Sequence, residues 1–398
     1  MRKRRSRILL AIALLAFLGA FLWHLSQPNE PIYQGQPLTV WLEAARQPLS
    51  DPDSTESIRQ IGTNAIPTLL RLLRAKDSSL KLRLIALAQK QSVIKFHNIS
   101  AEIQNNEGGE GFAILGAHAS NAVPALIKVF DDNISVSSRF STAGALGAIG
   151  LEAAPAIPSL LSEMTNSDMY LRTSIIQALG SIHSRPDLVV PVLTKSLQDT
   201  NSPICWFAAE ALGKFGPEAR AAIPTLIQLL ADQGVIVRRE TVSALGQIHS
   251  DPELVVPALI NALHDRSAEI RFFAATNLGS FGPAAKPAIP ALIQSLADQN
   301  EIVRLDAVSA LGQIHAEPEL VVPALINALD DQTNWILKRS VVRSLGSFGA
   351  AAKPAVPKLM ELLKDNDPIV RKRASEALQQ IDPEAAAKIL TAPDSIIK

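Results

Sequence analysis

Histidine is the residue type in this sequence whose spacing most resembles a ligand set. His183, His249 and His315 recur at intervals of 66 residues, and imidazole is a common zinc ligand that binds at about 2 Å. If each interval spans two helical layers of 8–10 Å, successive histidines lie roughly 20 Å apart. They cannot share a metal, and we interpret them as residues that cap the last carbonyls of three helices.

Other residues that could do chemistry have simpler structural interpretations. The glycines of 144–150 resemble a nucleotide loop, but no strand precedes them and Gly147 falls at a recurring Leu-Gly position, which favours close helix packing. The acidic pairs at 131–132 and 330–331 lack calcium-loop spacing. Cys205 is the single cysteine, which excludes an internal disulfide, and we expect it to be a small buried residue.

No Ser-His-Asp arrangement can be assembled with any specificity, because serine is scattered and the histidines hold a fixed register. The sequence therefore nominates no catalytic, metal-binding or cofactor-binding residue. We expect a protein that is not an enzyme and that has no cofactor.

The charge distribution argues against nucleic acid as a partner. The net charge is zero, from 38 basic and 38 acidic residues, but five of the basic residues lie among the first seven. The remainder is mildly acidic and has no basic stripe, which phosphate binding would need.

Length and composition predict an array of helices. A chain of 398 residues exceeds the roughly 250–300 at which one hydrophobic core stops growing. Hydrophobic residues make up 47% but aromatic residues only 5%, a composition typical of many small, closely packed helices.

The sequence repeats. Residues 223–255 and 289–321 match at 24 of 33 positions. A proline that follows Ile or Val in every unit recurs every 33 or 34 residues and defines eight units, with Pro124, Pro158, Pro191, Pro224, Pro257, Pro290, Pro323 and Pro357. The units alternate between a Leu-Gly-x-Phe-Gly ending, as at Phe215, and a Leu-Gly-x-Ile-His ending, as at His249, so the true module is predicted to be a pair of about 66 residues.

Each unit is predicted to contain two helices. The first starts at the proline, whose fixed φ and missing N–H suit the first helical turn. The second, as in 235–248, places Val237, Thr241, Ala244, Leu245 and Ile248 on one face of a 3.6-residue period. Neither helix buries its apolar stripe alone, so the units must stack.

The Pro-led helix, the turn Asp and the V-R-x-x-A-x-x-A-L-G pattern resemble short HEAT repeats, including the HEAT-like or phycobilisome-lyase type, over 121–388. The resemblance implies an all-α solenoid of the armadillo-like kind. It also implies a ladder in which each turn Asp pairs with an Arg six residues later, as Asp232 with Arg238 and Asp265 with Arg271. In the unit of Pro191 the Arg position holds Cys205, where we expect the ladder to be interrupted.

One row of residues is not explained by packing of the core. The residue after each ladder Arg points almost opposite the predicted core face, and in HEAT-like solenoids the second helices line the concave surface. We predict a partner-binding row there, with Phe140, Trp206, Arg239, Phe272, Leu305 and Arg339; Thr173 and Lys372 share its register. Packing between curved repeats is the alternative interpretation.

The N-terminus predicts export. Residues 8–25 form an apolar stretch of about 27 Å behind the basic run, enough to span a membrane, and the positive flank would hold the N-terminus in the cytoplasm. A single-pass anchor with the repeats outside the cytoplasm is favoured. A cleaved signal, giving a secreted or periplasmic protein, stays open.

The predicted organisation is therefore a signal anchor at 1–25, a linker at 26–36, divergent helical repeats at 37–120, eight HEAT-like units at 121–388 and a tail at 389–398. An irregular loop is expected near 108–111. The predicted function is a non-catalytic scaffold that binds a protein or peptide on its concave face; the alternatives are a lyase-like enzyme or enzyme subunit, and a structural envelope spacer.

Overall fold

A computed structural model describes residues 30–46, 52–78, 100–232, 234–329 and 335–391 of the chain. The chain divides into two compact units, Met1–Arg185 (unit 1) and Pro186–Lys398 (unit 2), and each is described by itself. The predicted anchor at 1–25 and the acidic pair at 330–331 lie outside the described residues.

Unit 1 begins with a small antiparallel hairpin, β1 (Ile32–Tyr33) and β2 (Gln36–Pro37), in a region that the sequence assigned mostly to a linker. Trp41 donates its indole N–H to the Tyr33 carbonyl oxygen at 3.2 Å, which ties the hairpin to the first helix. The helices that follow are α2 (Leu38–Ala45), α3 (Pro52–Ile61), η1 (Gly62–Ala65), α4 (Ile66–Leu73), α6 (Ala101–Leu115), η2 (Gly116–Ala122), α7 (Val123–Asp131), α8 (Val136–Ile149), η3 (Gly150–Ala156), α9 (Ile157–Ser162) and α10 (Met169–Ile182).

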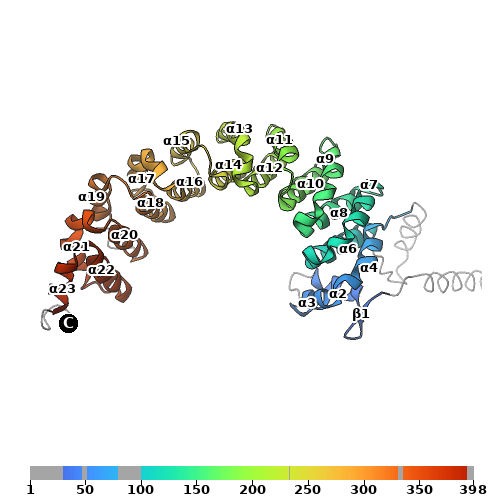
Figure 1. The fold of residues 1–398 in the computed structure, drawn as a ribbon, viewed down its shortest axis with the longest axis horizontal. Coiled ribbons are helices and arrows are strands. Elements are labelled where there is room, and N and C mark those ends of the chain that lie inside the picture. Colours follow the sequence, from blue (N-terminus) through green and yellow to red (C-terminus); the bar gives the residue numbers. More distant parts are fainter. Residues whose placement is uncertain (1–29, 47–51, 79–99, 233, 330–334, 392–398) are drawn as a thin grey trace, which may run out of the picture. The chain divides into compact units, whose positions relative to one another are not determined.

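Unit 2 is built from helix pairs in two layers, coloured from green to red in Figure 1. The first helices are α11 (Pro186–Ser196), α13 (Ile223–Leu229), α15 (Pro252–Ala262), α17 (Ile289–Ser295), α19 (Pro318–Ala328), α21 (Val356–Leu362) and α23 (Pro383–Thr391). The second helices are α12 (Ser202–Lys214), α14 (Val235–Ile248), α16 (Ala268–Ser280), α18 (Glu301–Ile314), α20 (Trp335–Ser347) and α22 (Pro368–Ile381). Short 3-10 segments lead into α13, α17 and α21, namely η4 (Gly216–Ala222), η5 (Gly282–Ala288) and η6 (Gly349–Ala355).

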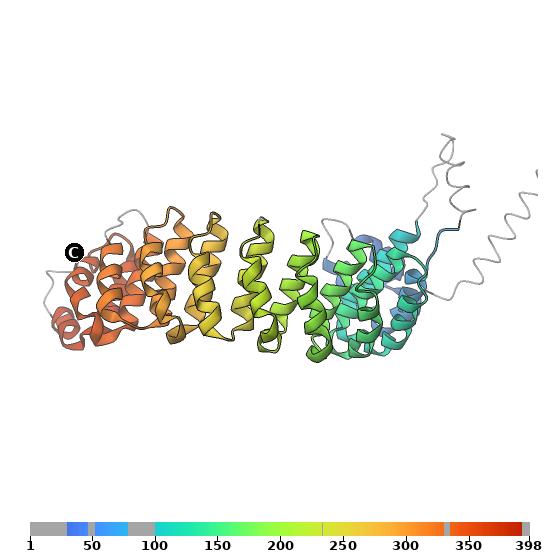
Figure 2. The same ribbon diagram turned by 90° about the horizontal axis from the view of Figure 1, so that it is seen from above.

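Within unit 2 the second helices lie side by side, each packed on the next from α12 to α22. Figure 2 shows the same stacking from above. The layer of second helices lies on the inner side of the curve that this unit makes in Figure 1. This is the stacked, all-α solenoid that the repeats predict.

The predicted core face is confirmed. In α14, Val237, Thr241, Ala244, Leu245 and Ile248 are each at most 1% exposed. Because neighbouring units present the same residue types, such faces pack against one another along the array.

The role of the recurring proline is confirmed in part. Five of the first helices begin one residue before it, as α13 begins at Ile223 before Pro224. In α11, α15 and α19 the helix begins five residues earlier, so that Pro257 lies inside α15, which starts at Pro252. The earlier proline already suits the first turn, and the cost of the inner proline is one missing N–H donor.

The loop expected near 108–111 is wrong, because these residues belong to α6. A Cβ on Gly111 would come within 2.3 Å of a Leu69 methyl carbon, and one on Gly108 within 3.0 Å of the Leu69 carbonyl oxygen. Glycine disfavours an isolated helix, but here it permits α6 to approach α4 closely. Gly147 acts as predicted, since its Cβ would lie 2.8 Å from the Ala178 backbone.

Two continuous helical stretches among the described residues, Ala101–Asp131 and Val136–Ser162, are long and apolar enough to cross a membrane by length and composition alone. Each includes a 3-10 segment, η2 or η3, and each packs against neighbouring helices of unit 1. Core helices of this kind pass the same test, so they carry no argument for a membrane span.

Candidate functional site

The ladder arginines join successive units. Arg238 donates from Nη1 to the backbone carbonyl oxygen of Asp232, in the turn of its own unit, at 2.8 Å. Its Nε and Nη2 donate to the two carboxylate oxygens of Asp265, in the next unit, at 2.7 and 3.0 Å. The carboxylate partner is therefore the Asp of the following unit, which corrects the pairing expected within one unit.

The same geometry recurs one unit further on. Arg271 donates to the Asp265 carbonyl oxygen at 2.9 Å and to both carboxylate oxygens of Asp298 at 2.7 and 2.8 Å. The hydrogen bonds from Arg271 hold the pKa of Asp298 below its usual range, although burial opposes them. For Asp265, burial acts to raise the pKa, but the hydrogen bonds from Arg238 and from the Ser267 N–H outweigh it and the pKa is lowered.

The ladder is interrupted at Cys205, as expected. The buried thiol donates to the Asp199 carbonyl oxygen at 2.7 Å and so replaces the half of the arginine contact that lies within the unit. Burial, together with the carboxylates of Asp199 and Asp232, raises the pKa of the thiol to about 11. A thiol that stays protonated at neutral pH is a donor and a poor nucleophile.

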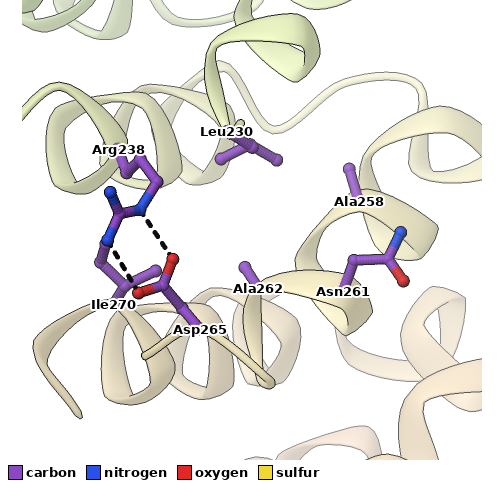
Figure 3. A pocket seen from close by; sticks show the side chains of 7 residues that line it. All are labelled: Leu230, Arg238, Ala258, Asn261, Ala262, Asp265 and Ile270. Atoms are coloured by element: carbon purple, nitrogen blue, oxygen red, sulfur yellow. Dashed lines mark hydrogen bonds and ion pairs between the residues drawn. The ribbon is translucent and has the colours of Figure 1, made fainter. Parts of the chain in front are cut away.

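A cleft of about 100 Å³ lies beside one ladder pair. Figure 3 shows the bidentate pair of Arg238 and Asp265 on one side of it and Asn261 on the other. The charged groups are already satisfied by each other, and the remaining walls are short apolar side chains such as Ala262 and Ile270. The geometry therefore describes a joint between units, with no free polar group of the pair directed at a ligand.

The histidines lie at helix ends but use their rings differently from the prediction. His249 and His315 follow α14 and α18 in the left-handed region, with φ of 47° and 49°, and their backbone N–H groups close the last turns. The rings stack on phenylalanines of the next unit, His249 on Phe281 at 4.4 Å and His315 on Phe348 at 4.8 Å between centroids. The His ending of one unit thus packs against the Phe ending of the next unit.

The predicted binding row divides between the two units of the chain. Phe140, on α8 of unit 1, is 39% exposed, whereas Thr173, in the same register, is buried. The members in unit 2 lie on successive second helices and are all partly exposed, namely Trp206, Arg239, Phe272, Leu305 and Arg339. None of them belongs to the core.

Each aromatic residue of the row in unit 2 contacts a neighbour on its own helix. The rings of Trp206 and Phe207 stack with centroids 3.6 Å apart, and those of Phe272 and Phe273 lie 4.5 Å apart. Arg239 differs, because it pairs with Glu240 and, at 3.2 Å, with Glu269 of the next helix. Aromatic pairs held in place in this way present a rigid apolar surface, which suits binding because little side-chain entropy is lost.

A second exposed row was missed by the sequence reasoning. One turn before the predicted row, the second helices of unit 2 expose aliphatic side chains between 39% and 53%, namely Ile236, Ile302, Ile336 and Ile369. The signal was available, since a residue three positions earlier lies on the same helix face. We call the members of the two rows that lie in unit 2, together with Phe207, Phe273 and Trp335, the inner-face stripe of unit 2.

Comparison with known families identifies the family to which the chain belongs. The family model described as HEAT repeats matches residues 157–246, 223–312, 256–346 and 322–393, which together cover more than half of the chain. The fold and the matched repeats define an α-solenoid, and the chain belongs to the HEAT-repeat family. A comparison with curated proteins finds no match.

Two solved structures of natural proteins share the fold. An importin beta structure shares 15% identity at a TM-score of 0.56 over 86% of this chain and 55% of its own. Kap95 in a complex with Nup1 shares 15% at 0.53, over 86% and 56%. An engineered protein shares 20% at 0.49, over 86% and 98%. The chain spans about half the length of the two natural relatives, and at these identities the likeness concerns the fold alone.

Proposed function

We propose that this protein is a non-catalytic scaffold that binds a protein segment on the inner-face stripe of unit 2. The observation that carries the proposal is a set of exposed aliphatic and partly exposed aromatic side chains on the second helices of unit 2, on the side away from the core. Exposed apolar rows of this kind mark binding surfaces. The importin beta and Kap95 structures share the fold, and the latter is described in a complex with Nup1.

The stripe has the anatomy of a binding surface. Trp206 stacks on Phe207 and Phe272 lies against Phe273 with the rings tilted, and the isoleucines stand one helical turn away on the same face. Large aromatic anchors surrounded by smaller apolar contacts supply most of the affinity in many interfaces. A surface on a preformed solenoid also needs little ordering when it binds.

The test is the double substitution Trp206→Ala with Phe272→Ala, in the full chain, followed by crosslinking in intact cells and quantification of the crosslinked partners. Because both side chains are partly exposed, we expect a small change in melting temperature but at least about a hundredfold weaker capture, the loss typical of two binding anchors.

The matched control is Leu254→Ala with Leu320→Ala. These leucines are 48% and 49% exposed but lie on first helices α15 and α19. We expect the control to capture partners as the parent does. Equal capture by the parent and the Trp206/Phe272 variant would contradict the proposal, and equal loss in both variants would indicate a different surface.

We further propose that residues 1–25 anchor the chain in a membrane with the repeats outside the cytoplasm. The support is the basic run before an apolar stretch of spanning length. Resistance to alkaline extraction, together with protease access to the repeats from the outer side only, would support this topology. Release of a shortened chain of lower intact mass would instead favour a cleaved signal.

A further inference from the structure

The charge of unit 2 is unevenly distributed along its second helices. From α12 to α18 the exposed charges are largely paired, as Lys214 with Glu210 at 2.8 Å and Arg239 with Glu269. The last two second helices differ, since α20 and α22 carry six cationic residues and one acidic residue, Glu376. The cationic residues are Lys338, Arg339, Arg343, Arg371, Lys372 and Arg373.

Part of this positive charge is engaged by the chain itself. Lys338 lies 3.3 Å from Asp365 and Arg339 lies 2.6 Å from Asp367, which also holds α20 against α22. Lys372 and Arg373 share the single carboxylate of Glu376, at 3.9 and 3.0 Å. One carboxylate does not neutralise two cations.

The rest of the positive charge has no carboxylate partner among the described residues. Arg343 is exposed and makes no ion pair there. Arg371 holds the ladder position, but within the part of the chain that the structure describes its guanidinium hydrogen-bonds only to the backbone carbonyl oxygens of Asp365 and Asn366. Arg271, by contrast, also donates hydrogen bonds to both oxygens of a carboxylate, that of Asp298.

Apolar side chains stand among these cations. Trp335 is 49% exposed, and the guanidinium of Arg339 lies 3.9 Å from the centre of its ring. Trp335, Arg339 and Arg343 are spaced four residues apart and so share one face of α20. Ile336 and Ile369, 39% and 44% exposed, flank them on α20 and α22. We call this set of six cations and three apolar residues the basic end of the stripe.

We propose that the basic end binds a segment of a partner protein in which acidic side chains alternate with apolar ones. The inference rests on the proposed function and adds the chemistry of the partner. Carboxylates match the unneutralised guanidinium and ammonium groups, and Arg binds a carboxylate in a bidentate geometry. Leucine-like or aromatic side chains match Trp335 and the two isoleucines.

The spacing of the surface sets the spacing of the partner. Neighbouring helices pack about 10 Å apart, and a chain in the polyproline II conformation has three residues per turn and rises about 3.1 Å per residue. Its residues i and i+3 face the same side about 9 Å apart, so an acidic residue at every third position would meet α20 and then α22. The second helices lie on the inner side of the curve of unit 2 (Figure 1), which suits a chain segment better than a flat bilayer.

The probe is a fluorescent peptide of about 15 residues in which Glu, Leu and Ser recur in turn, so that in the polyproline II conformation each type lies along one side of the chain. Its control has Lys in place of every Glu. Binding to the full chain in detergent is measured by anisotropy, with affinity expected to fall as salt is added, because exposed charges are screened. We expect the acidic peptide to bind and the lysine peptide not to.

The decisive variant is Arg343→Glu with Lys372→Glu, both at exposed positions. Its control is Lys353→Glu with Lys364→Glu, which makes the same change in net charge at exposed positions outside α20 and α22. We expect about tenfold or greater loss of affinity for the decisive variant and less than about twofold for the control.

Three results would overturn the proposal: no binding of the acidic peptide up to about 1 mM, equal loss in both charge variants, or displacement of the peptide by phosphatidylserine vesicles but not by phosphatidylcholine vesicles. The last would assign the surface to anionic lipid. If the Trp206/Phe272 variant loses its cellular partner while the Arg343/Lys372 variant keeps it, the proposed function stands and this inference fails.

Discussion

Arg238 and Arg271 each bond to three acceptor atoms and so join two successive units. In Arg271 the guanidinium bonds to the carbonyl oxygen of its own turn and to both oxygens of the next unit's carboxylate. Such charge-assisted, bidentate contacts are roughly twice as strong as neutral hydrogen bonds. The stability of these two joints therefore depends on the ionisation of one aspartate each, Asp265 and Asp298.

This dependence predicts how acid weakens unit 2. The pKa of Asp298 is lower in the folded chain than in the unfolded chain, so its contribution is present above about pH 4, the usual Asp value. It is lost as the pH falls from there through the lower folded value. Asp298→Asn should cost about 2 kcal/mol of unfolding free energy at pH 7, and this difference from the parent should shrink below about pH 4.

Urea unfolding between neutral and acidic pH measures the effect. The matched control is Glu361→Gln, whose carboxylate is 70% exposed and pairs with Lys358 at 3.5 Å. Exposed pairs contribute little, so the control should follow the parent at every pH. A difference between Asp298→Asn and the parent that stayed constant down to pH 3 would show that the ladder charge is not what stabilises the joint.

The direction of the ladder could not be predicted from the sequence. The spacing of six residues from Asp265 to Arg271 is as regular as that from Arg271 forward to Asp298, and both distances repeat with the units. Only the stacking brings the second carboxylate within reach. The partial exposure of the predicted row in unit 2 could be predicted, because helical periodicity fixes which residues point away from the core; its role in binding stays a prediction.

At the scale of elements, the residue after each second helix decides how two units meet. His249 adopts φ of 47°, a conformation that favours glycine, yet its ring stacks on Phe281. The Ile-His ending was visible in the sequence, but its partner was not, since the two rings are 32 positions apart and meet only when α14 and α16 pack.

Substitutions at His249 should separate the contribution of the left-handed backbone to stability from that of the stacked ring. His249→Ala removes the stack and keeps the left-handed backbone, so we expect a loss of about 1 kcal/mol in unfolding free energy. His249→Gly also removes the stack but relieves the backbone by about 1 kcal/mol, so it should be nearly neutral. Thermal and urea unfolding measure both.

His264→Ala is the matched control, because His264 is exposed and contacts only the Ile260 carbonyl oxygen among described residues, at 3.2 Å. It should change stability by less than about 0.5 kcal/mol. If His249→Ala behaved like this control, the stack would contribute nothing to the joint.

Glycine-containing segments show where element prediction fails. The region of Gly108 and Gly111 was expected to be a loop because glycine lowers helix propensity. The tertiary contact with α4 outweighs that propensity, since the positions demand the absence of a Cβ. The local sequence does not indicate the contact between α4 and α6. In the repeated units, by contrast, the recurrence of the same residue types indicates which positions pack.

At the scale of the whole molecule, we expect the module to be a pair of units. Deleting residues 223–288 joins Ala222 to Ile289, the same type of junction as in the parent, and preserves the alternation of Phe and His endings. We expect this chain to fold with the same helical content per residue and to melt cooperatively.

Deleting residues 223–255 instead removes one unit and brings two Phe endings into succession, leaving Phe281 without a histidine. We expect this chain to be less stable than the pair deletion although it is longer, with the lost stack alone contributing about 1 kcal/mol. Circular dichroism and thermal unfolding compare the two. Equal or greater stability of the single-unit deletion would contradict the paired module.

The stack of His249 on Phe281 also constrains how such a gene can grow or shrink. Recombination that copies one hairpin would place two identical endings next to each other, so that one junction lacks its His–Phe stack. Copying two hairpins keeps the His and Phe endings in alternation. Selection on folding would therefore allow these arrays to change length in even steps, which makes the parity of hairpin number an inherited property of the lineage.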